Sequence, residues 1–136
     1  MVAKKSVHVS GKRKSAVARA TLTEGKGVIR INSLKLSAYQ PEIARMMVEE
    51  PLMIAGDVHK KVDIKVNVFG GGWHSQAEAA RLVVAKALVE FVGNKKLKQD
   101  MLDYDRHLIV ADLGRHKEPH KPNDSKPRRA RQKSYR

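Results

Sequence analysis

The residues most able to do chemistry in this sequence of 136 residues are lysines and arginines, which bind phosphate groups. The segment GKRKS at 11–15 places Lys12, Arg13 and Lys14 in succession after a glycine. In a turn, these side chains and the neighbouring backbone amides can approach phosphates together. The GxxxxGK[ST] spacing of a nucleotide-binding loop is absent. We expect these three residues, with Arg19, to contact RNA phosphates; a solvated turn and a nucleotide-binding loop are the alternatives.

A second basic cluster occupies residues 115–136, with the sequence RHKEPHKPNDSKPRRARQKSYR. It holds nine Lys or Arg, two acids and three prolines, and its only apolar residues are Ala130 and Tyr135. Such a segment cannot bury enough surface to offset the entropy of ordering itself. We expect an extended arm that is mobile when free and ordered on RNA. Its candidate RNA-binding residues are Arg115, Lys117, Lys121, Lys126, Arg128, Arg129 and Arg131.

The formal charge of +14 is concentrated at the two ends of the chain. Residues 1–22 hold six bases and no acid, residues 115–136 hold nine bases and two acids, and residues 23–114 hold thirteen bases and twelve acids. Clustered cations release counterions when they neutralise phosphates, so this pattern is typical of nucleic-acid binders. A basic protein kept soluble by its charge is the alternative, although solubility does not require segregated charge.

The composition argues against several other classes of protein. The chain has no cysteine, so it has neither a disulfide nor a thiolate zinc site, which indicates a reducing compartment. It has no apolar run of about 18 residues and no secretory signal, so we expect a soluble, unexported protein with no membrane partner. Only six residues are aromatic, and most of them lie in apolar periodic stretches, so few aromatic rings are available to stack on nucleic-acid bases.

No catalytic or metal-binding pattern accompanies the bases. The six histidines form no HExxH motif, and the acids form no recognisable pair. The segment GGGWHSQ at 70–76 joins a predicted strand to a predicted helix, where glycines let the backbone approach a phosphate. Gly71 and Gly72 are therefore candidate RNA contacts; a purely structural turn and a small-molecule phosphate site are the alternatives. We expect no enzyme activity, no cofactor and no small-molecule substrate.

Alternation of apolar and polar residues predicts the strands. Residues 7–23 are expected to form one or two strands around the basic turn, with one face of the second run formed by Ala16, Ala18, Ala20 and Leu22. The turn at 24–27 leads into VIRI, which predicts a β-hairpin over residues 16–31. The clearest strand lies within 60–70, and the residues expected to face the core are Val62, Ile64, Val66 and Val68.

Three helices are predicted from spacing and end signals. The first follows Pro41 and reaches about Glu50, with an apolar side of Ile43, Met46 and Met47, and Pro51 ends it before a short turn. The second runs from Ser75 to Val92, with Ser75 and Glu78 as a capping box, and Gly93-Asn94 stops it. Its buried stripe is Ala77, Ala80, Val84, Ala87, Leu88 and Phe91.

The third helix is expected over residues 94–102, and residues 105–113 are ambiguous between strand and turn. Strands with interspersed helices in a chain this short predict an α/β (α+β) fold of two layers, a small sheet with helices on one face. The predicted organisation is an α/β domain over residues 1–114 and a basic arm over residues 115–136.

Several strings together resemble the family of small-subunit ribosomal protein nine. They are SGKRKSAVARATL at 10–22, VIRIN at 28–32, FGGGWHSQAEAARLVVAKAL at 69–88 and the arginine-rich end SYR. The match runs through nearly the whole chain in the order of the family. The terminal SYR and the Trp73-His74 pair resemble archaeal and eukaryotic members, whereas bacterial members have a different glycine loop.

The resemblance implies a left-handed β-α-β plate of the ribosomal protein S-five domain-two-like type, bound to small-subunit rRNA in the head of the cytoplasmic ribosome. Neighbouring head proteins would be further partners. It also implies that the arm reaches peptidyl-site tRNA, and we assign this contact to Lys133, Tyr135 and Arg136. From the residues alone, two rivals stay open: a DNA-compacting architectural protein and a small-molecule kinase with nucleotide on the glycine loop.

Overall fold

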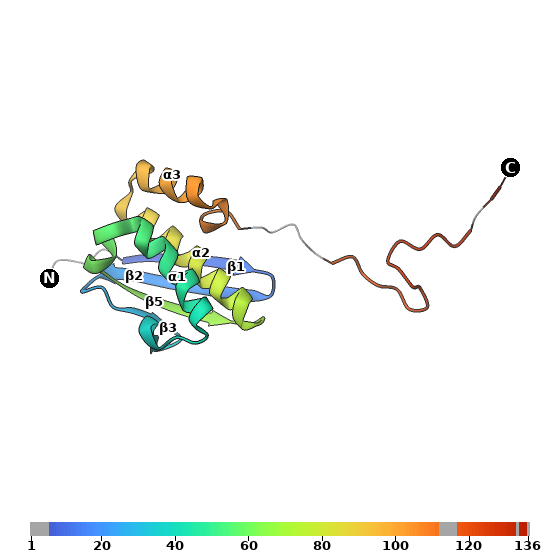
Figure 1. The fold of residues 1–136 in the computed structure, drawn as a ribbon, viewed down its shortest axis with the longest axis horizontal. Coiled ribbons are helices and arrows are strands. Elements are labelled where there is room, and N and C mark those ends of the chain that lie inside the picture. Colours follow the sequence, from blue (N-terminus) through green and yellow to red (C-terminus); the bar gives the residue numbers. More distant parts are fainter. Residues whose placement is uncertain (1–5, 112–116, 133, 136) are drawn as a thin grey trace.

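The computed structural model of the chain describes residues 6–111, 117–132, 134 and 135. A five-stranded mixed sheet has the order β1-β2-β5-β3-β4. Three α-helices lie against one side of it (Figure 1), which confirms the mixed α/β class. The strands are β1 (Ser6–Arg13), β2 (Ala16–Glu24), β3 (Ile29–Ile31), β4 (Leu34–Lys35) and β5 (Val62–Phe69). The helices are α1 (Glu42–Ala55), α2 (Trp73–Val92) and α3 (Lys95–Tyr104), with short 3-10 turns between elements and η3 (Arg106–Leu108) after α3.

The core lies between the sheet and the helices. Alternate residues of β2 and β5 are buried, as their sequences predict: Ala16, Ala18, Ala20, Leu22, Val62, Ile64, Val66 and Val68. The small residues of β1 and β2 let α2 approach closely, and a Cβ added at Gly11 would lie 2.8 Å from Leu82 Cδ2. No helix of the described residues covers the other face of the sheet, so its side chains are available to a partner.

The predicted β-hairpin over residues 16–31 is wrong. β2 pairs antiparallel with β1 and with β5, and β5 separates it from β3. The loop after β2 is held against β5, because Asp63 Oδ1 accepts the N–H of Lys26 at 2.9 Å and that of Val28 at 2.8 Å. β3 then runs parallel to β5, with Ile29 opposite Ile64. The pairing of β3 with β5 joins strands that are far apart in sequence, so the local alternation of apolar and polar residues cannot predict it.

The end and the apolar side predicted for the first helix are also wrong. α1 passes through Pro51 and ends at Ala55. Its buried residues are Ala44, Val48, Pro51, Leu52 and Ala55, whereas Ile43 is 61% and Met46 53% exposed. The smaller side chains suit close packing against α2, and burial of Leu52 and Ala55 offsets the cost of roughly 3 kcal/mol that an interior proline carries.

The second predicted helix is confirmed in its stripe and its end at Val92, but it starts two residues earlier than predicted and its capping box is wrong. α2 begins at Trp73 with Gly72 as the N-cap residue and no side-chain cap, so Ser75 already lies inside the helix. Glu78 instead contacts Arg13 of β1. The predicted stop is confirmed, since Gly93 is left-handed with φ of 66°. Of the stripe, five residues are buried and Phe91 is half-buried at the edge of the core.

The third predicted helix is confirmed as α3. The side chain of Asn94 accepts the N–H of Lys96 at 2.9 Å, and Leu97 and Met101 are buried. Of residues 105–113, which were ambiguous between strand and turn, Arg106–Leu108 form η3 with Leu108 fully buried, and residues 112 and 113 lie outside the described residues. The core therefore extends to Leu108, only a few residues before the basic C-terminal segment.

Candidate nucleic-acid interface

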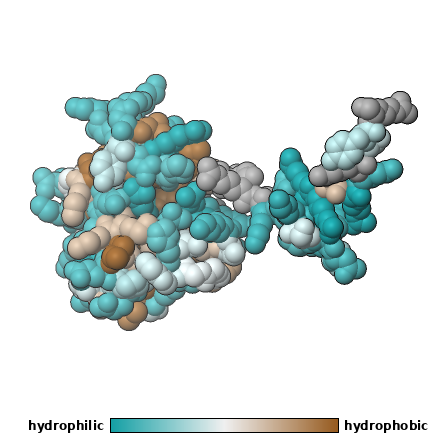
Figure 2. All heavy atoms as spheres, turned by 45° about the vertical axis from the view of Figure 1, so that its right-hand side comes forward, coloured by the Kyte–Doolittle hydropathy of each residue, from teal (hydrophilic) through white to brown (hydrophobic). Residues whose placement is uncertain are grey.

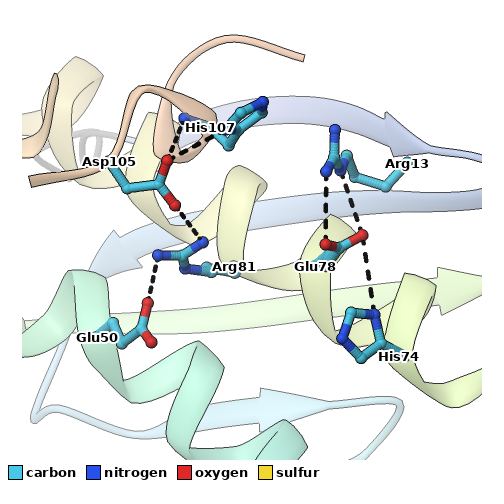
Figure 3. A network of polar contacts seen from close by, with 7 residues as sticks. All are labelled: Arg13, Glu50, His74, Glu78, Arg81, Asp105 and His107. Atoms are coloured by element: carbon cyan, nitrogen blue, oxygen red, sulfur yellow. Dashed lines mark hydrogen bonds and ion pairs between the residues drawn. The ribbon is translucent and has the colours of Figure 1, made fainter. Parts of the chain in front are cut away.

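The turn between β1 and β2 presents two of its three cations to solvent. Lys12 and Lys14 are exposed, and Lys14 has a positive φ of 52° at the turn. Arg13 points the other way, toward α2. Its Nε lies 3.3 Å from Glu78 Oε2, and its Nη2 donates to Glu78 Oε1 at 3.4 Å (Figure 3). Arg13 thus fastens the sheet to α2, and Lys12 and Lys14 are the cations of this turn that face solvent.

The glycine loop lies directly against the same turn. Gly70 and Gly71 both have positive φ, 77° and 67°. A Cβ at Gly70 would lie 2.7 Å from the carbonyl oxygen of Ser15, and one at Gly71 would lie 3.2 Å from the backbone nitrogen of Ala16. The close approach of two backbones requires these glycines, which favours the structural alternative for Gly71. At Gly72 an added Cβ would meet open space, so its backbone is accessible at the start of α2.

Arg19 lies on the sheet face opposite the helices, which we call the open face. Its guanidinium carbon is 5.8 Å from the centre of the Phe69 ring, within the range of a cation–π contact. Phe69 is 53% exposed. Cross-strand pairs share a face, so the register also places Lys12, beside Val17, on the open face.

Three further cations on the open face were missed by sequence reasoning: Arg30, Lys35 and Lys65. Arg30 lies opposite Lys65 on one side and opposite Lys35 on the other. All three are exposed, and within the described part of the chain none forms an ion pair. The alternation of residues 62–68 did predict that Lys65 faces solvent. The parallel pairing of β3 with β5, which brings Arg30 beside Lys65, cannot be predicted from neighbouring residues.

A partly buried network around Arg81 links α2 to α1 and to η3, the last helical turn before the C-terminal segment. Arg81 of α2 contacts Glu50 of α1, and its Nη1 donates to Asp105 Oδ2 at 2.8 Å (Figure 3). Asp105 also accepts the backbone N–H of His107 at 2.9 Å. Burial raises the pKa of Asp105, but the hydrogen bonds from His107 and Arg81 outweigh it, so the net pKa is lowered. The carboxylate therefore stays charged and fixes η3 to the helices.

The described residues of the C-terminal segment contain no helix or strand, and almost all are exposed. Figure 2 shows hydrophilic side chains along most of it. Arg131 Nη2 lies 2.9 Å from Asp124 Oδ2, and Arg128 pairs with Glu118. The rRNA contacts predicted within this segment are exposed wherever they are described: Lys117, Lys121, Lys126, Arg128, Arg129 and Arg131. Arg115, Lys133, Arg136 and the predicted boundary at 114/115 lie outside the described residues, and Tyr135 is 89% exposed.

Other chemistry finds little support in the described ranges. Among them, no three His, Cys, Asp or Glu residues are grouped to hold a metal ion. No helix within these ranges is long and apolar enough to cross a membrane. His74 has Glu78 as its neighbour, with Nδ1 and Oε2 4.0 Å apart, and Glu78 is already engaged by Arg13.

Comparison with known proteins decides the family. A model of the family described as ribosomal protein S9/S16 matches residues 11–136. The chain belongs to this family. The small ribosomal subunit protein uS9 of Methanococcus vannielii is 49% identical over 134 residues, which cover 97% of this chain and 99% of that protein. The protein of the same name from Methanococcus maripaludis (strain C7) is 48% identical over the same length.

Membership of the ribosomal protein S9/S16 family confirms the resemblance drawn from the sequence motifs. It is a family of ribosomal proteins and not of enzymes, which agrees with the prediction that the chain has no enzymatic activity. The ribosomal location predicted from the sequence is confirmed by the same membership.

Proposed function

We propose that this chain is a structural protein of the small ribosomal subunit that binds small-subunit rRNA in the head and contacts peptidyl-site tRNA through its C-terminal end. The observation that carries the proposal is the ribosomal protein S9/S16 match over residues 11–136, together with solvent-facing cations in the matched segments. The relatives' name, small ribosomal subunit protein uS9, supports the choice of subunit.

The proposed architecture is an rRNA-binding domain over residues 1–114 and an arm over residues 115–136. Buried residues continue to Leu108, and almost all of the described residues from 117 onward are exposed, which supports a division between them. We also propose the S-five domain-two-like plate with a left-handed β-α-β crossover. Its support is the parallel pair β3 and β5, which are joined through α1.

The proposed mechanism is binding without chemistry. Lys12, Lys14 and Arg19 would neutralise rRNA phosphates, and the backbone at Gly72 can approach a phosphate at the start of α2. Arg13 would contribute indirectly, because its pair with Glu78 fixes the turn. The cations of the arm would thread between RNA helices, and folding on binding lets such an arm follow surfaces that a compact domain cannot enter.

The proposed contacts with neighbouring head proteins have support on α1. Ile43, Met46 and Met53 are 61%, 53% and 73% exposed on its outer side. Exposed apolar side chains grouped on one element are typical of protein contacts. These residues therefore suit a protein neighbour better than RNA.

Replacing Lys12 and Lys14 by alanine should weaken binding to small-subunit rRNA and flatten its salt dependence. Two lost phosphate contacts should reduce the slope of log K against log salt by about 1.4 to 1.8 units, at ~0.7 to 0.9 per phosphate. Filter binding of the full chain to transcribed rRNA over a salt series measures both quantities, and duplex DNA as competitor tests the DNA-compacting alternative.

The matched control replaces Lys96 and Lys98, two exposed cations of α3, by alanine. It removes the same charge from the opposite layer, so the rRNA slope should change little. Equal slopes for the wild-type chain and the Lys12/Lys14 variant would mean that the turn does not touch phosphates. Preference for duplex DNA over rRNA would refute the proposed function itself.

A further inference from the structure

The open face of the sheet is a basic surface with one acidic side chain among its strand residues. Its exposed cations are Lys12, Arg19, Arg30, Lys35 and Lys65. The acid is Asp63, whose Oδ1 already accepts the backbone N–H groups of Lys26 and Val28. The charge of this face is thus largely uncompensated within the described chain, and it suits an anionic partner.

Three of these cations form a row across neighbouring strands. Lys35 of β4 lies opposite Arg30 of β3, which lies opposite Lys65 of β5. Adjacent strands are about 4.8 Å apart, so the row spans roughly 10 Å. Like charges directly opposite each other destabilise a sheet. An anion placed over the row removes this repulsion, and a hollow of about 350 Å³ beside Arg30 and Lys65, lined also by Val28 and Asp63, offers it room.

An aromatic platform lies on the same face. Phe69 is four residues beyond Lys65 on β5, about 13 Å away along the strand. Its ring is half-exposed and has the Arg19 guanidinium beside it. Unpaired bases stack on such rings and on guanidinium planes. Asn67, opposite Arg19 and exposed, supplies an amide that can pair with a base edge.

We infer that the open face binds a single-stranded segment of RNA, which stacks an unpaired base on Phe69 and lays its phosphates over Arg30, Lys65 and Lys35. An acidic protein segment would match the cations but would leave the aromatic platform without a role. This inference rests on the proposed rRNA binding and adds to it the open-face residues of β3, β4 and β5, which lie apart from the arm and border the turn at Lys12. It also assigns a base-stacking residue to a chain that has few aromatics.

Two full-length variants separate the parts of the site. Arg30→Gln with Lys65→Gln removes two of the row's three cations, and Phe69→Leu keeps an apolar side chain but removes the ring. The probe is an oligouridylate of ~10 nucleotides that contains 4-thiouridine, within the length that single-strand binders occupy. Anisotropy gives its affinity over a salt series, and photocross-linking with mass spectrometry gives the contacted peptide.

The double variant should bind the oligouridylate about 10-fold more weakly, with a salt slope lower by about 1.4 units, at ~0.7 per phosphate of a single strand. Phe69→Leu should weaken binding by about 5-fold to 150-fold without changing the slope, since stacking contributes ~1 to 3 kcal/mol per base. The wild-type cross-link should map to residues 62–69. Lys96→Gln with Lys98→Gln on α3 is the charge-matched control and should change little.

Equal losses in the α3 control and the open-face variant would overturn the inference, because net charge alone would explain them. Unchanged oligouridylate affinity and cross-links only in the arm would overturn it as well. If the open-face variants bind rRNA normally but enter subunits poorly, the partner is a protein and the inference is wrong. In each of these cases the proposed function still holds if rRNA binding depends on Lys12 and Lys14. Failure of the wild-type chain to bind rRNA would refute both the proposed function and the open-face inference.

Discussion

Removal of residues 117–136 should abolish stable binding to small-subunit rRNA and leave the domain folded. The truncation removes eight Lys or Arg and two acids, and it begins after Leu108, the last buried hydrophobic residue within the described ranges. If each cation contributes as little as ~0.5 kcal/mol, the sum of about 4 kcal/mol corresponds to roughly 1,000-fold in affinity. The salt slope should fall by about 4 to 5 units for the net loss of about six positive charges.

A shorter truncation provides the matched control. Removing residues 134–136 takes one cation, so rRNA binding and assembly should stay normal. Peptidyl-site tRNA affinity should fall by about 10-fold to 150-fold, because one desolvated charge-assisted contact is worth ~1.5 to 3 kcal/mol. Arginine can hold phosphate oxygens with two donors, which lysine cannot. Sedimentation measures assembly, and filter binding on purified subunits measures tRNA; unchanged tRNA affinity would contradict the assignment of this end of the chain.

Replacing Arg81 by methionine should lower the free energy of unfolding by about 2 to 4 kcal/mol. The change leaves Glu50 and Asp105 without their cation, and breaking a buried pair in this way costs about 3 to 5 kcal/mol. Both carboxylates keep some exposure, 32% and 30%, so solvent reduces the cost. A small domain has only roughly 5 to 15 kcal/mol in all, and urea denaturation will detect the difference.

Two comparisons identify the cause of that loss. Arg45→Met breaks more exposed pairs with Glu42 and Glu49 on α1 and should cost less than about 1 kcal/mol. The pH dependence gives the second comparison. Because the pKa of Asp105 is lowered from 3.8, its stabilisation is present above that pH and is lost as the pH falls through the lower folded value. The gap between wild type and Arg81→Met should therefore narrow in acid; a gap independent of pH would mean that lost packing, not charge, explains the effect.

The features that the sequence predicted correctly are those with a local cause. Alternation identified the buried side of β5, and the glycine after Val92 identified the end of α2, because both patterns act between near neighbours in the chain. The buried side of α1 could not be predicted from local spacing. Ile43 and Met46 are exposed, whereas the buried side of the helix carries Ala44, Val48, Pro51, Leu52 and Ala55, a choice that depends on how α1 packs against the rest of the fold.

The candidate site likewise has parts that local sequence predicts and parts that only long-range packing creates. The basic turn and the arm are contiguous in sequence and were visible as charge clusters. The pairing of Arg13 with Glu78 joins residues 65 positions apart, and the row of Arg30 and Lys65 exists only because β3 and β5 run side by side. Sequence reasoning therefore located the two contiguous basic clusters, but it could not show that Arg13 pairs with Glu78 or that the Phe69 ring lies exposed beside Arg19.

The central claim, that the chain is a structural rRNA-binding protein of the small ribosomal subunit, is tested most directly by sedimentation of native ribosomal subunits. Quantitative mass spectrometry of the gradient should find the chain in constant stoichiometric ratio to small-subunit rRNA. Treatment with ribonuclease should release it, and treatment with deoxyribonuclease should not. Absence from the small-subunit fractions, or co-sedimentation with DNA that deoxyribonuclease abolishes, would contradict the claim.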